Sequence, residues 1–373
     1  MGAIAEYFAE AESLPTPCLV LYRDRMQSNL RRLVEMSGDV SRLCPHLKTA
    51  KMEPVIHAYR EVGIDSFKCA TIAEAELAGR AGAASVLLAY PLVGPQPARF
   101  VRLAQHFPGT RWSALADSLV GVEMLERAAA EHQMRLTVLL DIDVGMHRTG
   151  IAPGPAAVEL YRRIHQSPHL VAGGLHIYDG HLHDTELAVR TERVRQAVDP
   201  ALMLRQQLLD QGLPVPRAVV GGSASFPIHR ANPLLECSPG TCVFWDSGYQ
   251  KLLPEQPFEP AVMLLTRVIS RPTADIACLD VGYKSVAAES PFPRLALLGD
   301  ENPEQIGQSE EHLMVRVKKS ESFPVGQLLF AIPKHICPTI ALHEHVHVVD
   351  AIPGGWQLAD RWPVTARVRQ LEF

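Results

Sequence analysis

Five polar side chains follow or end short apolar runs in the first two thirds of the sequence, where a fold could gather them for catalysis. They are Lys48, Arg148, His176, Tyr178 and His181. A lysine amine can form a covalent imine, an arginine is a permanent hydrogen-bond donor, and a histidine transfers protons near neutral pH. Taken singly, each has an ordinary explanation as a surface charge, an ion-pair partner or a buried structural histidine. Their shared position after apolar runs is what indicates a site.

A glycine-rich turn, Gly221-Gly222-Ser223, follows another apolar run. Because glycine has no Cβ, the backbone N–H groups of such a turn can approach an anion closely. Similar turns are common in proteins, so the turn alone does not identify a ligand. Its place late in a series of apolar runs is where parallel barrels often bind phosphate.

The apolar runs predict the eight parallel strands of a (β/α)8 barrel. They are apolar throughout, which is typical of parallel strands buried on both faces. Segments with helical spacing separate them, such as the stripe Met26, Leu30, Leu33 and Val34. Since catalytic residues of such barrels lie at the C-terminal ends of the strands, the polar residues above should converge at one mouth. The predicted strands cover residues 17–22, 42–47, 66–70, 85–90, 111–116, 136–142, 171–178 and 217–222.

After the proline-rich segment LLPEQPFEP the apolar pattern changes to a period of two. Residues 313–318 and 364–369 alternate apolar and polar side chains, which predicts antiparallel strands with one solvated face. The C-terminal third therefore forms a separate β domain. The predicted domains are a barrel over residues 14–255 and an antiparallel β domain over 256–373, with residues 1–13 as a candidate extension of the latter.

Composition excludes several classes of function. The formal net charge is −5, and the sequence contains no long run of charges of one sign. Both observations argue against a nucleic-acid surface or a polybasic membrane patch. No apolar run reaches the roughly 18 residues of a membrane span, and the N-terminus does not resemble a signal peptide. The seven cysteines are odd in number and have no C-x-x-C spacing. We therefore predict a cytoplasmic protein without disulfides that acts on a small molecule.

The motifs as a group resemble the D-threonine aldolase and D-serine dehydratase family, pyridoxal-phosphate (PLP) enzymes related in fold to alanine racemase. The resemblance implies the fold type III architecture, a barrel followed by an antiparallel β domain. The matching segments are TPCLVLY, PHLKTAK, CATIAEAE, DVGMHRTG, HIYDGH, the GGS turn, SPGTCVFWD, LDVGYKS, HICPT and the terminal RWPVTAR.

The resemblance also implies how the cofactor is held. Lys48 would carry PLP as a Schiff base, Arg148 would face the pyridine nitrogen, and Tyr178 would lie near the ring. A guanidinium only donates, so it favours an unprotonated ring nitrogen, which is a weaker electron sink. The residues implied to bind the cofactor are Lys48, Arg148, His176, Tyr178, Gly221, Gly222, Ser223, Gly240 and Thr241.

His335 and Cys337 form a candidate metal pair. An extended chain would point both side chains the same way, and Pro333 and Pro338 disfavour a helix there. On spacing alone, His-x-Cys is a weak signal, and two buried or structural residues explain the motif better than a metal site does. In the family this position binds a divalent cation, and an imidazole with a thiolate suits Zn²⁺ better than Mn²⁺ or Mg²⁺.

A second histidine run, His343, His345 and His347, would share one face of a strand, with Val346 and Val348 on the core side. We interpret this run as a solvated polar face.

The resemblance implies a PLP- and metal-dependent lyase of D-β-hydroxy amino acids, with D-threonine aldolase as the first candidate. His181 or a water on the metal would act as the base for cleavage, whereas in a dehydratase Lys48 would take the Cα proton. D-serine dehydratase and 3-hydroxy-D-aspartate aldolase or dehydratase remain alternatives. A racemase has only Tyr283 as a nearby base, and a non-catalytic PLP-binding barrel would not explain the β domain. Fold relatives also imply a homodimer.

One residue departs from the family pattern. Cys242 stands in SPGTCVFWD where the family commonly has a tyrosine. The hydrogen bond of that hydroxyl would be missing, which bears on the substrate range.

Overall fold

The computed structural model describes residues 5–299, 302–318 and 322–373, which form two compact units. Each unit combines separate stretches of chain. The barrel unit contains Leu33–Lys48, Val55–Gly240 and Val368–Phe373. The sheet unit contains Met1–Arg32, Thr49–Pro54 and Thr241–Arg367.

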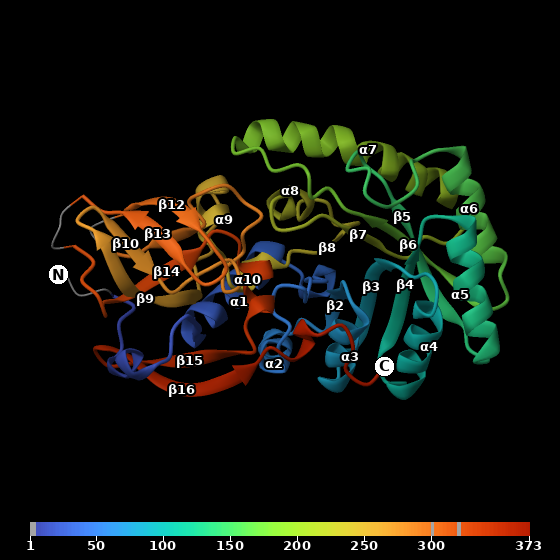
Figure 1. The fold of residues 1–373 in the computed structure, drawn as a ribbon. Coiled ribbons are helices and arrows are strands. Elements are labelled where there is room, and N and C mark those ends of the chain that lie inside the picture. Colours follow the sequence, from blue (N-terminus) through green and yellow to red (C-terminus); the bar gives the residue numbers. More distant parts are fainter. Residues whose placement is uncertain (1–4, 300–301, 319–321) are drawn as a thin grey trace. The chain divides into compact units, whose positions relative to one another are not determined.

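The barrel unit is built on a curled parallel sheet in the order β2-β3-β4-β5-β6-β7-β8 (Figure 1). The segment before β2 forms parallel bridges at both ends, Leu43 with Cys237 and His46 with Lys68, and so joins the first strand to the last. The result is a barrel of the (β/α) type. The strands are β2 (Ser66–Cys69), β3 (Ser85–Pro91), β4 (Arg111–Ala116), β5 (Leu136–Ile142), β6 (Leu170–Ile177), β7 (Ala218–Val220) and β8 (Glu236–Cys237).

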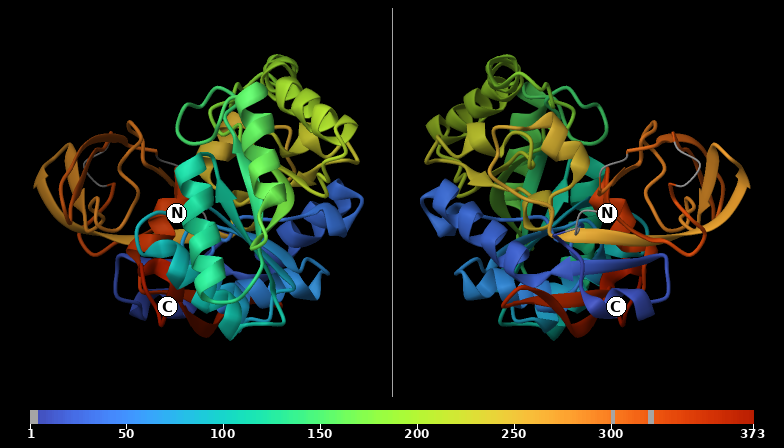
Figure 2. Two further views of the ribbon diagram at one scale, coloured as in Figure 1. Left: turned by 90° about the vertical axis from the view of Figure 1, so that its right-hand side faces the viewer. Right: turned by 90° about the vertical axis from the view of Figure 1, so that its left-hand side faces the viewer.

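Apolar side chains fill both faces of this sheet. Leu87 of β3, Leu115 of β4 and Leu139 of β5 belong to one buried cluster with Cys44 and Val219. Figure 2 shows helices of this unit along the outside of the strands, and they cover the other face. The helices are α2 (Glu53–Glu61), α3 (Ile72–Arg80), α4 (Gln96–His106), α5 (Leu119–Glu131), α6 (Pro155–Gln166), α7 (Leu187–Asp210) and α8 (Phe226–His229), with η2 (Val40–Arg42).

The sheet unit contains a nine-stranded sheet, in which β1 lies between β9 and β15. β1 pairs antiparallel with β9 and parallel with β15. Its strands are β1 (Cys18–Tyr22), β9 (Val262–Thr273), β10 (Ile276–Leu279), β11 (Leu295–Leu297), β12 (Glu304–Gln308), β13 (Leu313–Arg316), β14 (Leu328–Pro333), β15 (His345–Ile352) and β16 (Gly355–Pro363). Its helices are η1 (Ala9–Ser13), η3 (Thr241–Val243), α9 (Ser247–Leu252), α10 (Ile336–Leu342) and η4 (Thr365–Arg367), and α1 (Arg23–Ser37) crosses the boundary between the units.

Six of the eight predicted barrel strands are confirmed as β2 to β7. The run at 42–47 makes only the two bridges, and the run at 17–22 is wrong as a barrel strand because it is β1 of the other sheet. All five residues of β1 are buried, so their hydrophobicity cannot reveal which sheet they join. The strand β8 was missed because it is only two residues long.

In the C-terminal third, the alternating run at 313–318 is confirmed as β13, whose residues are alternately buried and exposed. The strand predicted at 364–369 is wrong. The preceding strand β16 ends at Pro363, and the chain enters the 3-10 helix η4 directly after Val364. A proline has no N–H with which to continue a ladder. No described helix is both long and apolar enough to cross a membrane.

Candidate active site

Lys48 stands at the carboxyl end of the segment that joins β8 to β2. Its backbone N–H donates to His46 Nδ1 at 3.2 Å, and its side chain is partly exposed. The amine makes no hydrogen bond or ion pair with any residue that the structure describes, and it lies 5.7 Å from the ring centroid of Tyr178. A lysine amine without a partner at a strand end is available for covalent chemistry.

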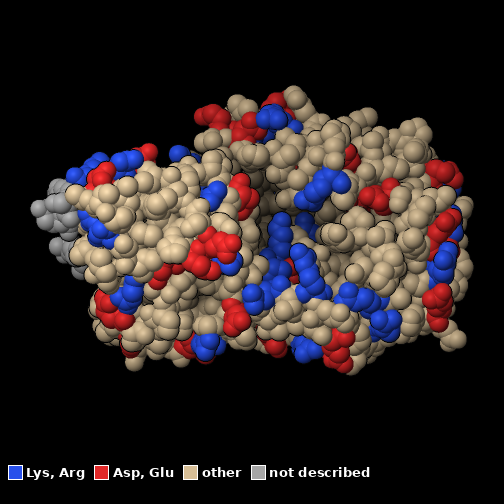
Figure 3. Space-filling view, in the orientation of Figure 1, with Lys and Arg blue, Asp and Glu red and all other residues tan. Residues whose placement is uncertain are grey.

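Three cationic side chains surround the ring of Tyr178, which directly follows β6. The Arg148 guanidinium lies 4.9 Å from the ring centroid, the Lys68 amine 5.3 Å and the Lys48 amine 5.7 Å. Figure 3 shows Lys and Arg as well as Asp and Glu side chains over the face that it draws. Cations converging on one aromatic ring point to a site for an anionic ligand.

The loop after β5 carries Arg148 to this ring. Asp143 Oδ1 accepts from the N–H groups of Gly145 and His147, at 2.9 and 3.0 Å, and Asp141 accepts from Thr149 at 2.8 Å. Both carboxylates are therefore used to shape the loop, not to pair with Arg148.

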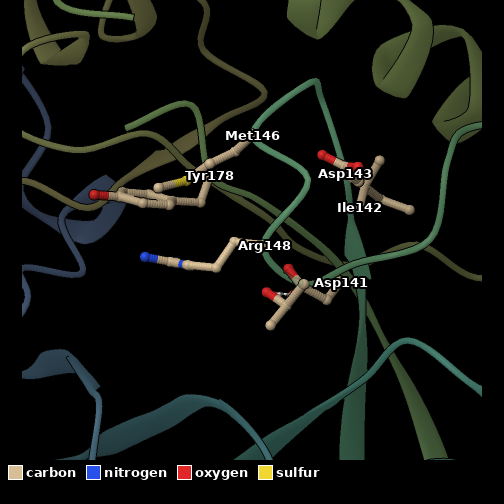
Figure 4. Close-up of a pocket in the computed structure, with 7 residues that line it drawn as sticks. Asp141, Ile142, Asp143, Met146, Arg148 and Tyr178 are labelled. Atoms are coloured by element: carbon tan, nitrogen blue, oxygen red, sulfur yellow. Dashed lines mark hydrogen bonds between the residues drawn. The ribbon is translucent and has the colours of Figure 1, made fainter. Parts of the chain in front are cut away.

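The same loop lines a small, partly open pocket. In Figure 4 the side chains of Arg148 and Tyr178 extend from different loops toward the same side of this pocket. The lining residues are Asp141, Ile142, Asp143, Met146, Arg148, Thr149 and Tyr178.

His176 lies in the barrel interior, hydrogen-bonded on both sides. Its Nδ1 lies 2.7 Å from Asp141 Oδ1, and its Nε2 lies 3.5 Å from Lys68 Nζ. Burial lowers the pKa of His176, although the hydrogen bond to Asp141 opposes this. A neutral ring that donates from Nδ1 accepts at Nε2, so His176 can accept a hydrogen bond from the Lys68 amine. Sequence reasoning missed Lys68, because one lysine in an apolar run gives no sign of where its side chain points.

The glycine-rich turn directly follows β7. Gly221 has φ +69°, and a Cβ there would lie 2.7 Å from Ser225 Oγ and from His229 Cδ2, so only glycine fits. The N–H of Gly222 donates to Ser225 Oγ at 3.2 Å, and that of Gly240 donates to Ser223 Oγ at 3.2 Å. Two of the N–H groups predicted to hold phosphate therefore donate to neighbouring serine hydroxyls in this structure.

A buried carboxylate supports this turn. Asp179 accepts from Ser225 Oγ at 2.7 Å and pairs with His229 Nε2 at 2.6 Å. The serine and the histidine both bind the aspartate, whereas a hydrolytic triad requires the serine to bind the histidine. The three residues therefore form a support for the turn and not a nucleophile.

His335 and Cys337 lie in the sheet unit, at the start of α10. The predicted extended conformation is wrong, because His335 caps the helix and Cys337 lies in its first turn. Pro338 is tolerated there, since N–H groups of a first helical turn need no partner in the helix. Asp246 Oδ2 accepts from the N–H of Ile336 at 3.0 Å and so fixes the backbone between the two side chains.

The imidazole of His335 lies between a carboxylate and a thiol. Nδ1 is 2.5 Å from Glu289 Oε1, and the ring also hydrogen-bonds Cys337. Burial lowers the pKa of His335, but the hydrogen bond and charge of Cys337, together with Glu289, outweigh it and raise the pKa to about 9. Cys337 Sγ lies 3.0 Å from Thr49 Oγ1 and 3.4 Å from Thr241 Oγ1.

The alanine racemase N-terminal domain model matches residues 21–248, more than half of the chain. The chain belongs to this family. A serine dehydratase domain model matches residues 261–349. A D-threonine aldolase from Arthrobacter sp is 28% identical over 360 residues, which are 94% of this chain and 92% of that enzyme. A D-threo-3-hydroxyaspartate dehydratase from Delftia is 26% identical over 353 residues, which are 88% of this chain and 92% of that enzyme.

The fold agrees with this assignment. The crystal structure of D-threonine aldolase from Filomicrobium marinum matches with a TM-score of 0.85 at 27% identity, over 95% of this chain and 96% of that one. The residues of the barrel unit fit the PLP cofactor that membership of the alanine racemase family implies. This unit contains the Lys48 amine, which has no hydrogen-bond or ion-pair partner among the described residues, and the Arg148 guanidinium beside the same Tyr178 ring. It also contains the turn at Gly221, where a Cβ would occupy the available space.

A divalent cation also has donors that fit. The imidazole of His335 and the thiol of Cys337 are within hydrogen-bond reach of each other, and this donor set suits Zn²⁺. No group of three or more metal-binding side chains occurs in the described ranges.

The histidine run differs from its prediction in one residue. His345 and His347 lie in β15 with Val346 and Val348 buried behind them, as expected. His343 does not share this face, because it ends α10 and its Nε2 donates to the carbonyl of Ser285 at 2.8 Å.

The remaining predicted residues divide between the units. His181 packs against the Arg148 loop, because a Cβ at Gly145 would lie 3.5 Å from its Nε2. Its Nδ1 is buried and has no partner among the described residues. Thr241 belongs to the sheet unit, where it contacts Cys337. Cys242 is buried in η3 and offers no hydroxyl.

Proposed function

We propose that the chain is a PLP- and divalent-metal-dependent lyase of D-β-hydroxy amino acids, with D-threonine aldolase as the first candidate. The observation that carries the proposal is the Lys48 amine, which has no partner among the described residues and shares the Tyr178 ring with Arg148. The family and the lyases that match over about nine tenths of the chain support it.

PLP, when bound, withdraws electrons from the bonds around the amino acid Cα. Lys48 would hold the cofactor as an imine and, once displaced, would carry a proton to or from Cα. Arg148 would donate to the pyridine nitrogen and keep it unprotonated. Tyr178 would lie against the ring, with His176 behind it.

The phosphate would be held by Gly221, Gly222, Ser223, Gly240 and Thr241. The Asp179 support keeps the first turn in the shape that its N–H groups require. Since Asp179 already holds Ser225 and His229 behind the first turn, little backbone ordering would be needed there on binding.

His335 and Cys337 would bind the divalent cation, with Zn²⁺ preferred over Mn²⁺ and Mg²⁺. A cation there would lower the pKa of a substrate hydroxyl and orient it. Thr49 and Thr241, which both contact Cys337, directly follow Lys48 and Gly240 in the chain.

In the aldolase reaction, His181 would take the proton of the β-hydroxyl, and the Cα–Cβ bond would break to release an aldehyde and glycine. Its buried Nδ1 without a partner supports this role. The second candidate is a dehydratase, in which Lys48 would take the Cα proton and hydroxide would leave Cβ, giving a 2-oxo acid and ammonia. The Delftia relative and the histidine–thiol pair favour this second reaction.

Two experiments test the proposal. Borohydride reduction of the PLP-loaded protein followed by peptide mapping should place the pyridoxyl group on Lys48, and a label on another lysine would refute the assignment. Acetaldehyde from D-threonine and pyruvate from D-serine, measured with and without chelator, should distinguish aldolase from dehydratase. If neither D-threonine, D-serine nor 3-hydroxy-D-aspartate is cleaved, the lyase assignment is wrong.

We further propose a cytoplasmic homodimer, which the resemblance to this family implies. Sedimentation of the PLP-loaded protein should give twice the mass of one chain, and a monomer at micromolar concentration would contradict it.

A further inference from the structure

Lys68 is a buried cation that the proposed function does not use. Its side chain is 2% exposed and leaves the middle of β2. The amine lies 3.5 Å from His176 Nε2 of β6 and 3.5 Å from the carbonyl oxygen of Gly221, which follows β7. Neither strand is a neighbour of β2 in the sheet, so the side chain spans the barrel interior.

No carboxylate pairs with this amine in the part of the chain that the structure describes. Its two hydrogen-bond partners are neutral, and both distances are at the limit of a hydrogen bond. Asp141 and Asp179 influence the Lys68 amine only by long-range electrostatic attraction. The oxygens of Asp141 bind His176 and Thr149, and those of Asp179 bind Ser225 and His229. A buried ammonium without a counter-ion is costly, so its charge needs a partner that arrives with a ligand.

The position of Lys68 indicates where that ligand binds. Its amine and that of Lys48 lie on the same ring, 5.3 and 5.7 Å from the Tyr178 centroid, and Arg148 completes the group. Burial, followed by the charge of Lys48, lowers the pKa of Lys68 to about 7, while Cys44, Asp141 and Asp179 oppose this. An anionic group that enters beside Lys48 would restore full protonation of Lys68.

We propose that Lys68 contacts the bound cofactor directly, pairing its ammonium with an anionic oxygen of PLP. The inference rests on the proposed function, in which Lys48 carries PLP. Two oxygens have the required chemistry. The ring oxygen of PLP is adjacent to the aldehyde that Lys48 attacks, and the phosphate would lie at the turn that begins with Gly221.

The test titrates full-length protein, freed of cofactor, with PLP and separately with pyridoxal, which lacks the phosphate. Lys68→Met removes the charge and keeps the length of the side chain, and Lys68→Gln serves if that variant does not fold. The control is Lys284→Met, a lysine that is 56% exposed and pairs with Glu310 in the sheet unit. Dissociation constants come from the absorbance of the imine.

The Lys68 variant should bind PLP roughly tenfold to a hundredfold more weakly, whereas the control should bind as wild type. An equal loss for pyridoxal assigns the contact to the ring oxygen, and a loss confined to PLP assigns it to the phosphate. Unchanged affinity for both ligands overturns the inference, as does an effect on the KM for substrate alone. Because the label on Lys48 is read separately in wild type, failure of the proposed function is distinguishable from failure of this contact.

Discussion

Removing the charge of Lys68 should stabilise the cofactor-free protein, and the gain should depend on pH. Burial lowers the pKa of Lys68 from 10.5 to about 7. The unfolded chain therefore binds this proton more tightly than the folded one. The buried Lys68 charge lowers the free energy of unfolding by its full amount below pH 7. This destabilisation shrinks as the pH rises from 7 to 10.5 and is absent above that range.

The magnitude follows from the shift. A difference of about 3.5 pKa units at 1.36 kcal/mol each gives about 5 kcal/mol as the largest cost of the buried charge. Lys68→Met also loses the two contacts with His176 and Gly221, worth about 1 kcal/mol each. The variant should therefore be more stable than wild type by about 3 kcal/mol at pH 6, and less stable by about 2 kcal/mol at pH 10.5.

The assay is urea unfolding of both cofactor-free proteins at pH 6, 8 and 10, followed by tryptophan fluorescence. The difference in unfolding free energy should change sign across this range, while Lys284→Met should show no such crossing. If the Lys68→Met curve lies below wild type by a constant amount at every pH, the lysine is a structural contact and the reasoning about its desolvation is wrong.

Three further substitutions give separate expectations. Gly221→Ala would place a Cβ 2.7 Å from His229 at φ +69°, and should cost about 1–3 kcal/mol in thermal unfolding and weaken PLP binding; normal PLP affinity would contradict the role of the turn. Cys337→Asp replaces a soft ligand with a hard one, and metal analysis after dialysis should show a shift from Zn²⁺ toward Mn²⁺ or Mg²⁺. Glu289→Gln removes the carboxylate that orients His335 and should weaken metal binding about tenfold in competition with a chelator, while PLP content stays constant.

The placement of the barrel residues could be predicted because it follows from topology. Lys48, Arg148, Tyr178 and Gly221 stand at the carboxyl ends of strands, and parallel strands bring these ends to one side of a barrel. That inference needs only the order of the strands. The sequence prediction wrongly counted β1 as a barrel strand and missed β8. Because these two errors cancel in the number of segments, the expected position of the strand ends did not change.

Other features depend on facts that a linear pattern does not contain. Cys337 lies in a helical turn because Asp246, distant in the sequence, accepts the N–H of Ile336. Lys68 looks like an ordinary charge between Phe67 and Cys69, and only the curvature of the barrel carries its amine across to β6. Both errors concern side chains whose neighbours come from remote segments.

The central place of β1 has a consequence for biosynthesis. Residues 18–22 are synthesised long before their partners β9 and β15, which lie beyond residue 261. During synthesis, β1 therefore remains an apolar segment without strand partners until most of the polypeptide has been made. Such a segment can bind chaperones or pair with the wrong strand. Fragments that begin after β1 would lack a central strand of the C-terminal sheet. The folding of the C-terminal third of the chain therefore depends on residues 18–22.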